Sequence, residues 1–233
     1  MVIQHGEPGD RRHPGWPAAL GPLPSRAGDV MLRPLQRRDG AAWRRLRLRD
    51  RERIERWDAT SPATWADRHS PAAWRQHYAL LMRAARRGGC LPFAVTVDGG
   101  FEGQVTLGGI SRGALCSAWI GYWVGADAAG SGVATAAVAL AVAHALGPVG
   151  LHRVEATIDP ENAASRTVVE HVGMREEGLL RRYLDIAGAW RDHVLYALTV
   201  EEMPGGVDPA EALIAEYLRE RGPAPGAHGD NEA

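Results

Sequence analysis

An apolar run of 14 residues, Val133–Leu146, constrains the fold of this chain more than any other part of the sequence. It is too short to cross a bilayer, which takes about 20 apolar residues, and a helix that is apolar on all sides must be buried. A Gly/Ala-rich loop, Gly125–Gly132, precedes the run, and a strongly strand-forming segment, Ser117–Val124, precedes the loop. This order predicts a strand that leads through a glycine loop into a buried helix.

Other segments show strand and helix patterns on both sides of this unit. The predicted strands are 30–35, 92–97, 101–110, 117–124, 152–158, 174–180 and 193–200. The predicted helices are 39–50, 70–88, 133–146, 162–172 and an amphipathic helix opened by Asp208-Pro209. The order predicts an α/β or α+β domain, with a central mixed, mostly antiparallel sheet of about six or seven strands that is flanked by helices.

The two ends of the chain differ in composition from its middle. Residues 1–28 contain five Gly and five Pro, and such a segment buries too little apolar surface to offset the entropy lost on ordering. We therefore expect a flexible tail over 1–28, one folded domain over 29–203, a C-terminal helix over 204–221 and a disordered tail over 222–233.

Composition excludes several kinds of chemistry. All 27 basic residues are Arg, so no lysine is present to form a Schiff base or to complete a Gly-Lys-Ser/Thr phosphate loop. The formal net charge of −1 argues against a dedicated nucleic-acid binder. The two cysteines, Cys90 and Cys116, have no metal-ligand spacing, and the first 30 residues have no secretory signal pattern. We expect a cytoplasmic protein with reduced thiols and no bound metal.

The glycine loop before the apolar helix predicts a site for an anion. The N–H groups at a helix start have no partner inside the helix, and the helix dipole adds partial positive charge there. Gly130 and Gly132 leave the backbone open to an approaching phosphate. The loop therefore predicts a pyrophosphate cradle that needs no lysine. The alternative is an ordinary strand-to-helix turn, because a short Gly-x-Gly is a weak signal by itself.

A second block of residues gives this loop a context. It consists of Arg153, Glu155, Ala156, Pro160, Asn162, Ser165 and Gly173-Met174, and the first block consists of Gly121–Val124, Gly130, Gly132, Ala134 and Thr135. With Glu176–Tyr183 and Trp190–His193, the sequence resembles the GCN5-related N-acetyltransferase (GNAT) superfamily. Within that superfamily it is similar to the RimJ/RimL-type ribosomal-protein-alanine N-acetyltransferases, over about residues 30–203.

This resemblance implies an enzyme with acetyl-CoA as co-substrate, which transfers the acetyl group to an amine by direct attack on the thioester. It implies the GNAT fold, in which the fourth and fifth strands splay apart and the pantetheine lies in the gap like an added strand. The implied acceptor is the N-terminal α-amine of a ribosomal protein. A small amine, such as an antibiotic or a polyamine, and a non-catalytic acyl-CoA-binding module are the alternatives. Neither a membrane nor a nucleic-acid partner is expected, and a homodimer is left open.

The resemblance also implies the residues of the site. Those expected to bind the cofactor are Trp123, Val124, Ala129, Gly130, Ser131, Gly132, Val133, Ala134, Asn162 and Ser165. Many members have a tyrosine acid seven residues after the Asn, but this chain has Val169 there. In the RimL type a Ser three residues after the Asn does this work, so the resemblance implies Ser165 as the acid, and a hydroxyl bonded to the helix backbone is its alternative. Asp127 stands where an Arg or Gln is common.

The general base and the acceptor groove are less well marked. Glu155 is the first candidate for the base, and Glu102 and Asp192 come second. A salt bridge of Glu155, or a water chain without a dedicated base, is the alternative. Tyr183 and Trp190 are the candidate walls of the acceptor groove.

Residues 44–56 are rich in arginine, and four tryptophans lie close to them in the sequence. The arginines predict either a solvated helix face or a docking patch for an acidic partner or rRNA. Most of the tryptophans are expected to be core residues, with one or two of them lining the acceptor groove. The four are Trp43, Trp57, Trp65 and Trp74.

Overall fold

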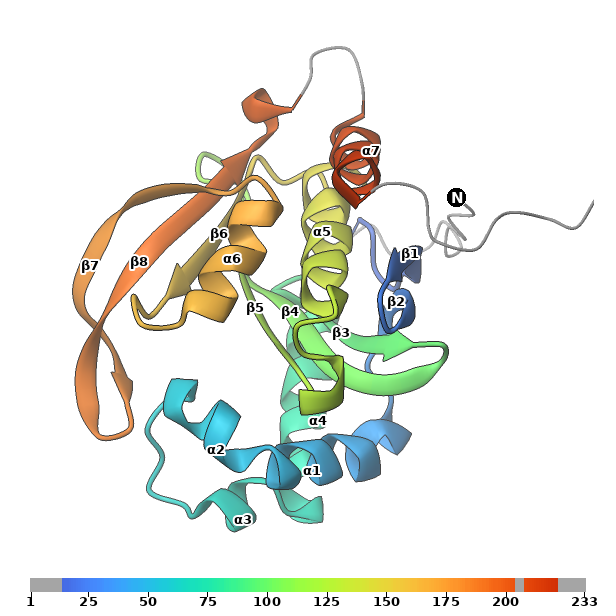
Figure 1. Cartoon of the computed structure of the whole chain (residues 1–233). Coiled ribbons are helices and arrows are strands. Elements are labelled where there is room, and N and C mark those ends of the chain that lie inside the picture. Colours follow the sequence, from blue (N-terminus) through green and yellow to red (C-terminus); the bar gives the residue numbers. More distant parts are fainter. Residues whose placement is uncertain (1–13, 204–207, 222–233) are drawn as a thin grey trace, which may run out of the picture.

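Helix α5 (Val133–Leu146) lies against a large sheet near the centre of the molecule (Figure 1). The computed structural model describes residues 14–203 and 208–221. Every residue of α5 except Ala134 is buried, as the apolar run predicts. The glycines at its two ends, Gly132 and Gly147, are its N-cap and C-cap. The limits of this helix are therefore those that the sequence indicates.

The described residues form an eight-stranded sheet in the order β1-β2-β3-β4-β5-β6-β8-β7. All neighbouring strands are antiparallel except β5 and β6, which are parallel. The strands are β1 (Leu20–Ser25), β2 (Gly28–Pro34), β3 (Cys90–Val97), β4 (Gly100–Ser111), β5 (Ser117–Val124), β6 (Arg153–Ile158), β7 (Arg175–Ile186) and β8 (Ala189–Thr199). The predicted mixed, mostly antiparallel sheet is confirmed, with one more strand than the sequence patterns indicate.

Helices cover both faces of the sheet. The larger core lies between the sheet and α5, α6 and α7, and a second core lies between the other face and α1 and α4. The α-helices are α1 (Gly40–Arg49), α2 (Arg51–Ile54), α3 (Trp65–Arg68), α4 (Pro71–Arg86), α5, α6 (Ala163–His171) and α7 (Pro209–Arg221). Short 3-10 helices are η1 (Arg37–Asp39), η2 (Glu55–Trp57), η3 (Ala126–Ala128) and η4 (Val200–Glu202). Neighbouring strand residues serve different cores: Val95 belongs to the larger one and Ala94 to the second.

Strands β5 and β6 part soon after they meet. Their pairing joins only Ser117, Ala118 and Trp119 to residues 153–155. Beyond these pairs, β5 continues to Val124 and β6 to Ile158. The opening leaves one edge of β5 free of strand partners, so an extended ligand can pair with it. This is the predicted splay; the strands are the fifth and sixth here because β1 precedes the family's first strand.

The expected tail over residues 1–28 is wrong in its second half. Residues 20–25 form β1, which pairs with β2 so that Leu23 lies opposite Val30. Leu23 is buried, and Trp16 and Leu20 are partly buried against the larger core. These apolar side chains supply the burial that the Gly and Pro content hides. Residues 1–13 and the predicted tail over 222–233 lie outside the described residues.

The last two strands are longer than predicted. Strand β7 extends six residues beyond the expected end at Leu180, to Ile186, and β8 begins at Ala189 rather than His193. The pairing shifts between Leu180 and Leu184, and Arg182 has a φ of +50° within that irregular stretch. A bulge of this kind breaks the period-2 pattern from which strands are predicted. Within the described residues, no helix has both the length and the apolar character to cross a membrane.

Candidate functional site

A cavity of about 1310 Å³ opens where the free part of β5 faces the start of α5 and the helix α6. Its wall includes the β1–β2 turn, the region of α2 and η2, the end of β5, the glycine loop and one face of α6. These segments are distant in the sequence, and the splay brings them together. The cavity therefore lies at the two features that the sequence singles out, the loop and the splay.

The glycine loop presents an uncapped helix start to this cavity. Gly132 is the N-cap of α5, with a φ of +92°, and no side chain caps the helix. The first helical hydrogen bond runs from Ala136 N to Gly132 O, so the N–H groups of the first turn have no partner inside the helix. A Cβ on Gly130 would meet no atom within 4 Å, so the space in front of the loop is open. These features fit a diphosphate.

Most residues expected to bind the cofactor do line the cavity. They are Trp123, Val124, Ala129, Gly130, Gly132, Ala134, Asn162 and Ser165. The other two support the loop instead. Ser131 Oγ donates a hydrogen bond to Ala128 O at 2.7 Å, and Val133 is fully buried in the core. Their side chains therefore hold the shape of the loop.

Asp127 points away from the cradle. Its carboxylate forms an ion pair with Arg49, with Nη1 to Oδ2 at 2.6 Å, and its side chain is 75% exposed. Asp127 is not among the residues that line the cavity. The acid at this position therefore leaves the backbone cradle intact, but it brings no positive charge to it.

The end of β5 is held by arginines from α1 and α2. Arg53 donates a hydrogen bond to Val124 O. The guanidinium of Arg47 lies 5.1 Å from the ring of Trp123 and 5.1 Å from that of Trp65, distances that suit cation–π contacts. These contacts fix the strand end whose backbone faces the cavity.

Asn162 and Ser165 open α6 beside the splay. The Oδ1 of Asn162 accepts a hydrogen bond from Ser165 N at 3.2 Å, so Asn162 is the N-cap of α6. Tyr122 Oη donates to Ser165 O at 3.0 Å. Burial raises the pKa of Tyr122 above its ordinary value, which keeps this phenol protonated. Among the described residues, the Ser165 hydroxyl has no hydrogen-bond partner, so the backbone-bonded alternative is not what the structure shows.

A second cavity of about 210 Å³ lies between the parted strands. Four residues line both cavities: Trp57, Tyr122, Asn162 and Ser165. The lining also includes Asp159 from the end of β6, Leu184 and Ile186 from β7, and His193 from β8. His193 is 4% exposed, and its Nδ1 lies 3.3 Å from Arg191 O. The two cavities thus meet at the side chains around Ser165.

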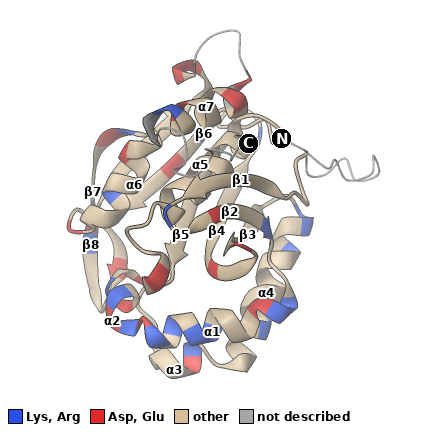
Figure 2. Cartoon of the chain, turned by 45° about the vertical axis from the view of Figure 1, so that its right-hand side comes forward, with Lys and Arg blue, Asp and Glu red and all other residues tan. Residues whose placement is uncertain are grey.

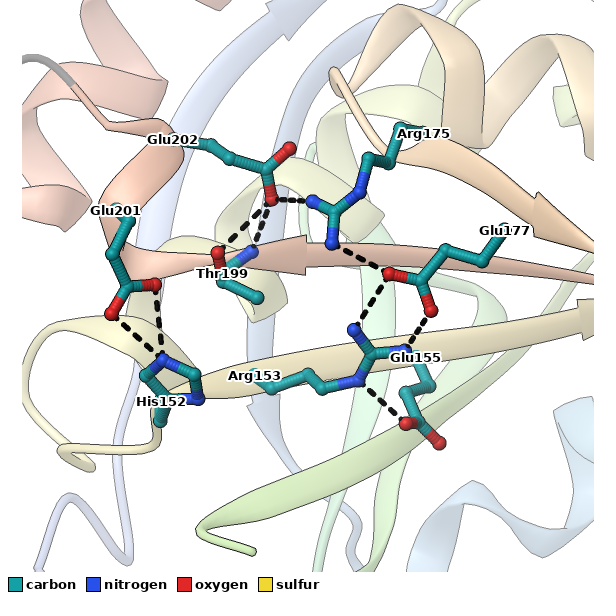
Figure 3. A network of polar contacts seen from close by, with 8 residues as sticks. All are labelled: His152, Arg153, Glu155, Arg175, Glu177, Thr199, Glu201 and Glu202. Atoms are coloured by element: carbon teal, nitrogen blue, oxygen red, sulfur yellow. Dashed lines mark hydrogen bonds and ion pairs between the residues drawn. The ribbon is translucent and has the colours of Figure 1, made fainter.

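Glu155 is outside both cavities. Its Oε1 accepts a hydrogen bond from Arg153 Nε at 2.6 Å, and Arg153 also pairs with Glu177 (Figure 3). Arg175 joins Glu177 to Glu202 in the same network. The geometry therefore matches the salt-bridge alternative rather than the role of base.

The second candidates for the base lie outside the cavities as well. Asp192 accepts a hydrogen bond from Arg182 N at 2.7 Å in the β7–β8 hairpin. Glu102 Oε2 is buried without a hydrogen-bond partner, and burial, with the nearby charge of Asp127, raises its pKa. Neither residue is among those lining the larger or the smaller cavity.

The two residues predicted as walls of the acceptor groove lie on the β7–β8 hairpin. Tyr183 and Trp190 are 44% and 65% exposed and line neither cavity. Tyr183 instead contacts the ring of His193, with ring centroids 5.7 Å apart. Their neighbours on the same hairpin, Leu184 and Ile186, form the wall. The register shift in β7 decides which side chains face the cavity, and the sequence gives no signal for it.

Of the four tryptophans, three are core residues and one lines the cavities, as expected. Trp43, Trp65 and Trp74 are buried, and Trp57 lines both cavities. His69 sits beside Trp65, with its Nδ1 2.7 Å from Trp65 O and its Nε2 accepting from Arg47 Nε at 3.0 Å. Burial lowers the pKa of His69 to about 4, so the ring is neutral and holds Arg47 in place.

The arginine-rich region is largely engaged within the molecule. Figure 2 shows blue residues along α1 and both blue and red residues around α2. Arg47 pairs with Asp58, Arg49 with Asp50 and Asp127, and Arg51 with Glu55. This arrangement resembles the solvated, ion-paired face more than a free docking patch.

Comparisons with known proteins agree with this geometry. Residues 29–175 match the family described as acetyltransferase (GNAT) domain. The chain is 42% identical over 96 residues to the probable N-acetyltransferase YjcK of Bacillus subtilis. The aligned residues cover 41% of this chain and 53% of that protein. It is 28% identical over 138 residues to the [ribosomal protein uS5]-alanine N-acetyltransferase of Escherichia coli, covering 58% and 71%.

A solved structure, Mycobacterium smegmatis RimJ in complex with CoA-disulfide, is similar over nearly the whole fold. It is 50% identical, with a TM-score of 0.83, and the match covers 87% of this chain and 96% of that chain. A RimL structure in complex with coenzyme A is 17% identical with a TM-score of 0.69, so it shares the fold.

Proposed function

The chain belongs to the GNAT acetyltransferase family as an acetyl-CoA-dependent N-acetyltransferase, and we propose that its acceptor is the N-terminal α-amine of a ribosomal protein. Two similarities support this acceptor: a RimJ structure at 50% identity and a curated relative that acts on ribosomal protein uS5. A ribosomal acceptor would place the reaction in the cytoplasm.

One observation carries the direct transfer of the acetyl group between two bound reactants: β5 and β6 pair over three residues and then part. The larger cavity lies at the uncapped start of α5, and the smaller one lies between the parted strands. They meet at Trp57, Tyr122, Asn162 and Ser165. Two reactants can therefore enter separately and come together at one place, as direct transfer without a covalent enzyme intermediate requires.

The residues around the larger cavity suit coenzyme A along its length. The first turn of α5 would hold the pyrophosphate, and the free edge of β5 near Trp123 and Val124 would hold the pantetheine. Acetyl-CoA supplies the activated acetyl thioester. Backbone N–H groups of β5 that face the carbonyl would stabilise the negative charge that develops on its oxygen.

The transfer forms an N–C bond and breaks the C–S bond of the thioester. The departing sulfur carries a negative charge and takes a proton from the Ser165 hydroxyl, which has no hydrogen-bond partner among the described residues and lines both cavities. The N-cap bond to Asn162 and the bond from Tyr122 fix the backbone of Ser165. Ser165 regains its proton from water.

The amine must lose a proton before or during attack, since an α-amine has a pKa near 8. In the smaller cavity, where the acceptor would bind, the side chains that can take this proton are Asp159 and His193. Asp159 Oδ1 already accepts from Glu161 N at 2.9 Å. An N–H at His193 Nδ1 would donate to Arg191 O and leave Nε2 as an acceptor. We therefore assign the proton to His193, in place of Glu155.

Peptide acetylation tests the acceptor. The protein is incubated with acetyl-CoA and peptides that copy the N-termini of ribosomal proteins, beginning with Ala or Ser, and the products are weighed by mass spectrometry. Acetylation at the α-amine is expected. The matched control has the same sequence with a blocked N-terminus and one internal lysine. Modification of the lysine, or of polyamines and aminoglycosides alone, would reject the proposed acceptor.

A further inference from the structure

The turn between β1 and β2 forms part of the rim of the larger cavity. Pro24, Ser25 and Arg26 are among the residues that line it. Arg26 N donates a hydrogen bond to Ser131 O at 3.0 Å, and the Arg26 guanidinium donates to Gly130 O. A segment that precedes the family match at residue 29 is thus fastened to the loop expected to hold the pyrophosphate.

The cradle needs a positive charge that its own loop does not supply. The phosphates of coenzyme A carry several negative charges, and charged hydrogen bonds to phosphate are stronger than neutral ones. The loop has Asp127, whose charge is balanced by Arg49 away from the cavity. The arginines among the residues that line the cavity are Arg26 and Arg53. Arg53 donates to Val124 O, at the end of β5 rather than at the glycine loop.

Arg26 is placed to supply that charge. Its side chain is exposed at the cavity rim, and a guanidinium has five N–H donors in a planar fork that matches phosphate oxygens. One nitrogen contacts Gly130 O, which leaves other donors for a ligand in front of the loop. The open space beyond Gly130 lies on the same loop.

We propose that the β1–β2 turn belongs to the coenzyme A site and that Arg26 binds its phosphate groups. Arg26 takes the place of the basic or amide side chain that the loop lacks at Asp127. This inference rests on the use of acetyl-CoA but not on the identity of the acceptor. It assigns a binding role to a turn that lies before the matched family domain.

Calorimetric binding of coenzyme A to the full-length protein tests this role without any acetyl transfer. Arg26→Ala is expected to weaken coenzyme A binding about 10-fold, and Arg26→Lys to restore part of the loss, because one charged contact is removed or retained. Dephospho-coenzyme A, which lacks the 3′-phosphate, identifies the group that is bound. An equal loss with both ligands assigns Arg26 to the pyrophosphate, and a loss with coenzyme A alone assigns it to the 3′-phosphate.

The matched control is Arg86→Ala, which removes an exposed arginine from the last turn of α4 and should leave the affinity unchanged. Thermal unfolding of the free variants checks that Arg26→Ala is folded. Unchanged affinity for both ligands in Arg26→Ala would overturn the proposal. An equal loss of affinity for S-acetylpantetheine, which has no phosphate, would overturn it too, because Arg26 would then act only on the shape of the loop. If every ligand binds as expected but no peptide is acetylated, the acceptor is wrong and the role of Arg26 stands.

Discussion

The proposed transfer depends on a single side-chain group, the hydroxyl of Ser165. Its backbone is fixed from two sides, by Asn162 Oδ1 at its N–H and by Tyr122 Oη at its carbonyl, while its hydroxyl stays without a partner among the described residues. In the first turn of a helix a serine hydroxyl commonly bonds to nearby backbone. The arrangement holds the residue still and leaves its proton available.

Ser165→Ala should lower kcat by about 100-fold, the low end of what a general acid contributes. The affinity for coenzyme A should change by less than about two-fold, because the substitution removes only the hydroxyl and leaves the backbone hydrogen bonds of residue 165 in place. Single-turnover kinetics and calorimetry measure the two quantities. Ser111→Ala, at the end of β4, is the control. An unchanged kcat would remove Ser165 as the acid and leave the proton to water.

His69 gives a prediction for stability rather than for turnover. Its pKa is lowered to about 4 by burial, and it accepts a hydrogen bond from Arg47, so protonation would break that bond and place two cations together. Between pH 6.5 and 4 the unfolded chain therefore binds a proton that the folded chain does not, and the free energy of unfolding falls as the pH falls.

Urea unfolding at pH 7.5 and pH 5 measures this effect. The wild type should lose about 1–2 kcal/mol more over this interval than His69→Gln, whose side chain does not titrate. The subtraction removes the contribution of the other histidines. Equal losses in the two proteins would show that His69 is protonated in the fold without cost.

Side-chain positions were predicted well where the local sequence fixes them and poorly where contacts between distant elements decide. The sequence places Asn162 and Ser165 at a helix start, and the structure has them there. Alternation puts Glu155 and Thr157 on one face of β6 but does not say which face. Thr157 lines the smaller cavity, whereas Glu155, on the same face, is held by Arg153, which also pairs with Glu177. His193 was missed because only the splay brings it to the cavity.

Elements were predicted to the extent that their cause is local. Helix α5 is a continuous apolar run with a glycine at each end, so its predicted limits are correct. Strand β1 depends on partners elsewhere: it pairs with β2, and Leu23 packs into a core built mainly from later residues. A Gly/Pro-rich composition hides such a strand. The bulge in β7 is hidden in the same way, because pairing with β8 decides it.

The junction between loop and helix offers a test at the scale of the element. Gly132→Glu should weaken coenzyme A binding by at least about 100-fold, since a side chain at a φ of +92° costs about 1–2 kcal/mol and a carboxylate would repel phosphate at close range. Calorimetry measures the affinity.

Gly113→Glu is the matched control for this substitution. Gly113 also has a positive φ, +75°, with open space around it, and it lies in the turn after β4, away from the cavities. It therefore carries the same backbone cost and the same charge. Comparable binding by the two variants would mean that the start of α5 does not hold the phosphates.

At the scale of the whole molecule, segments near the two ends of the described chain meet beside the glycine loop. Helix α7 packs on α5 through Ala210 and Leu213, and Tyr217 Oη donates a hydrogen bond to Pro24 O at 2.9 Å, across 193 residues of sequence. Pro24 lies in β1, two residues before Arg26. The C-terminal helix thus contacts the strand end before the turn, and the glycine loop contacts Arg26 in the turn.

This connection predicts that α7 affects coenzyme A binding without touching the ligand. Tyr217→Phe removes the bond to Pro24 and should weaken binding about two- to three-fold, because a single hydrogen bond contributes about 1 kcal/mol and the turn keeps its other contacts. If the effect passes through Arg26, the same substitution in an Arg26→Ala background should change the affinity much less, since coupled residues are not additive. Calorimetry on the four proteins closes the cycle, with Tyr78→Phe in α4 as the control. Full additivity of the two substitutions would mean that Tyr217 is not coupled to Arg26 in coenzyme A binding and contributes to stability alone.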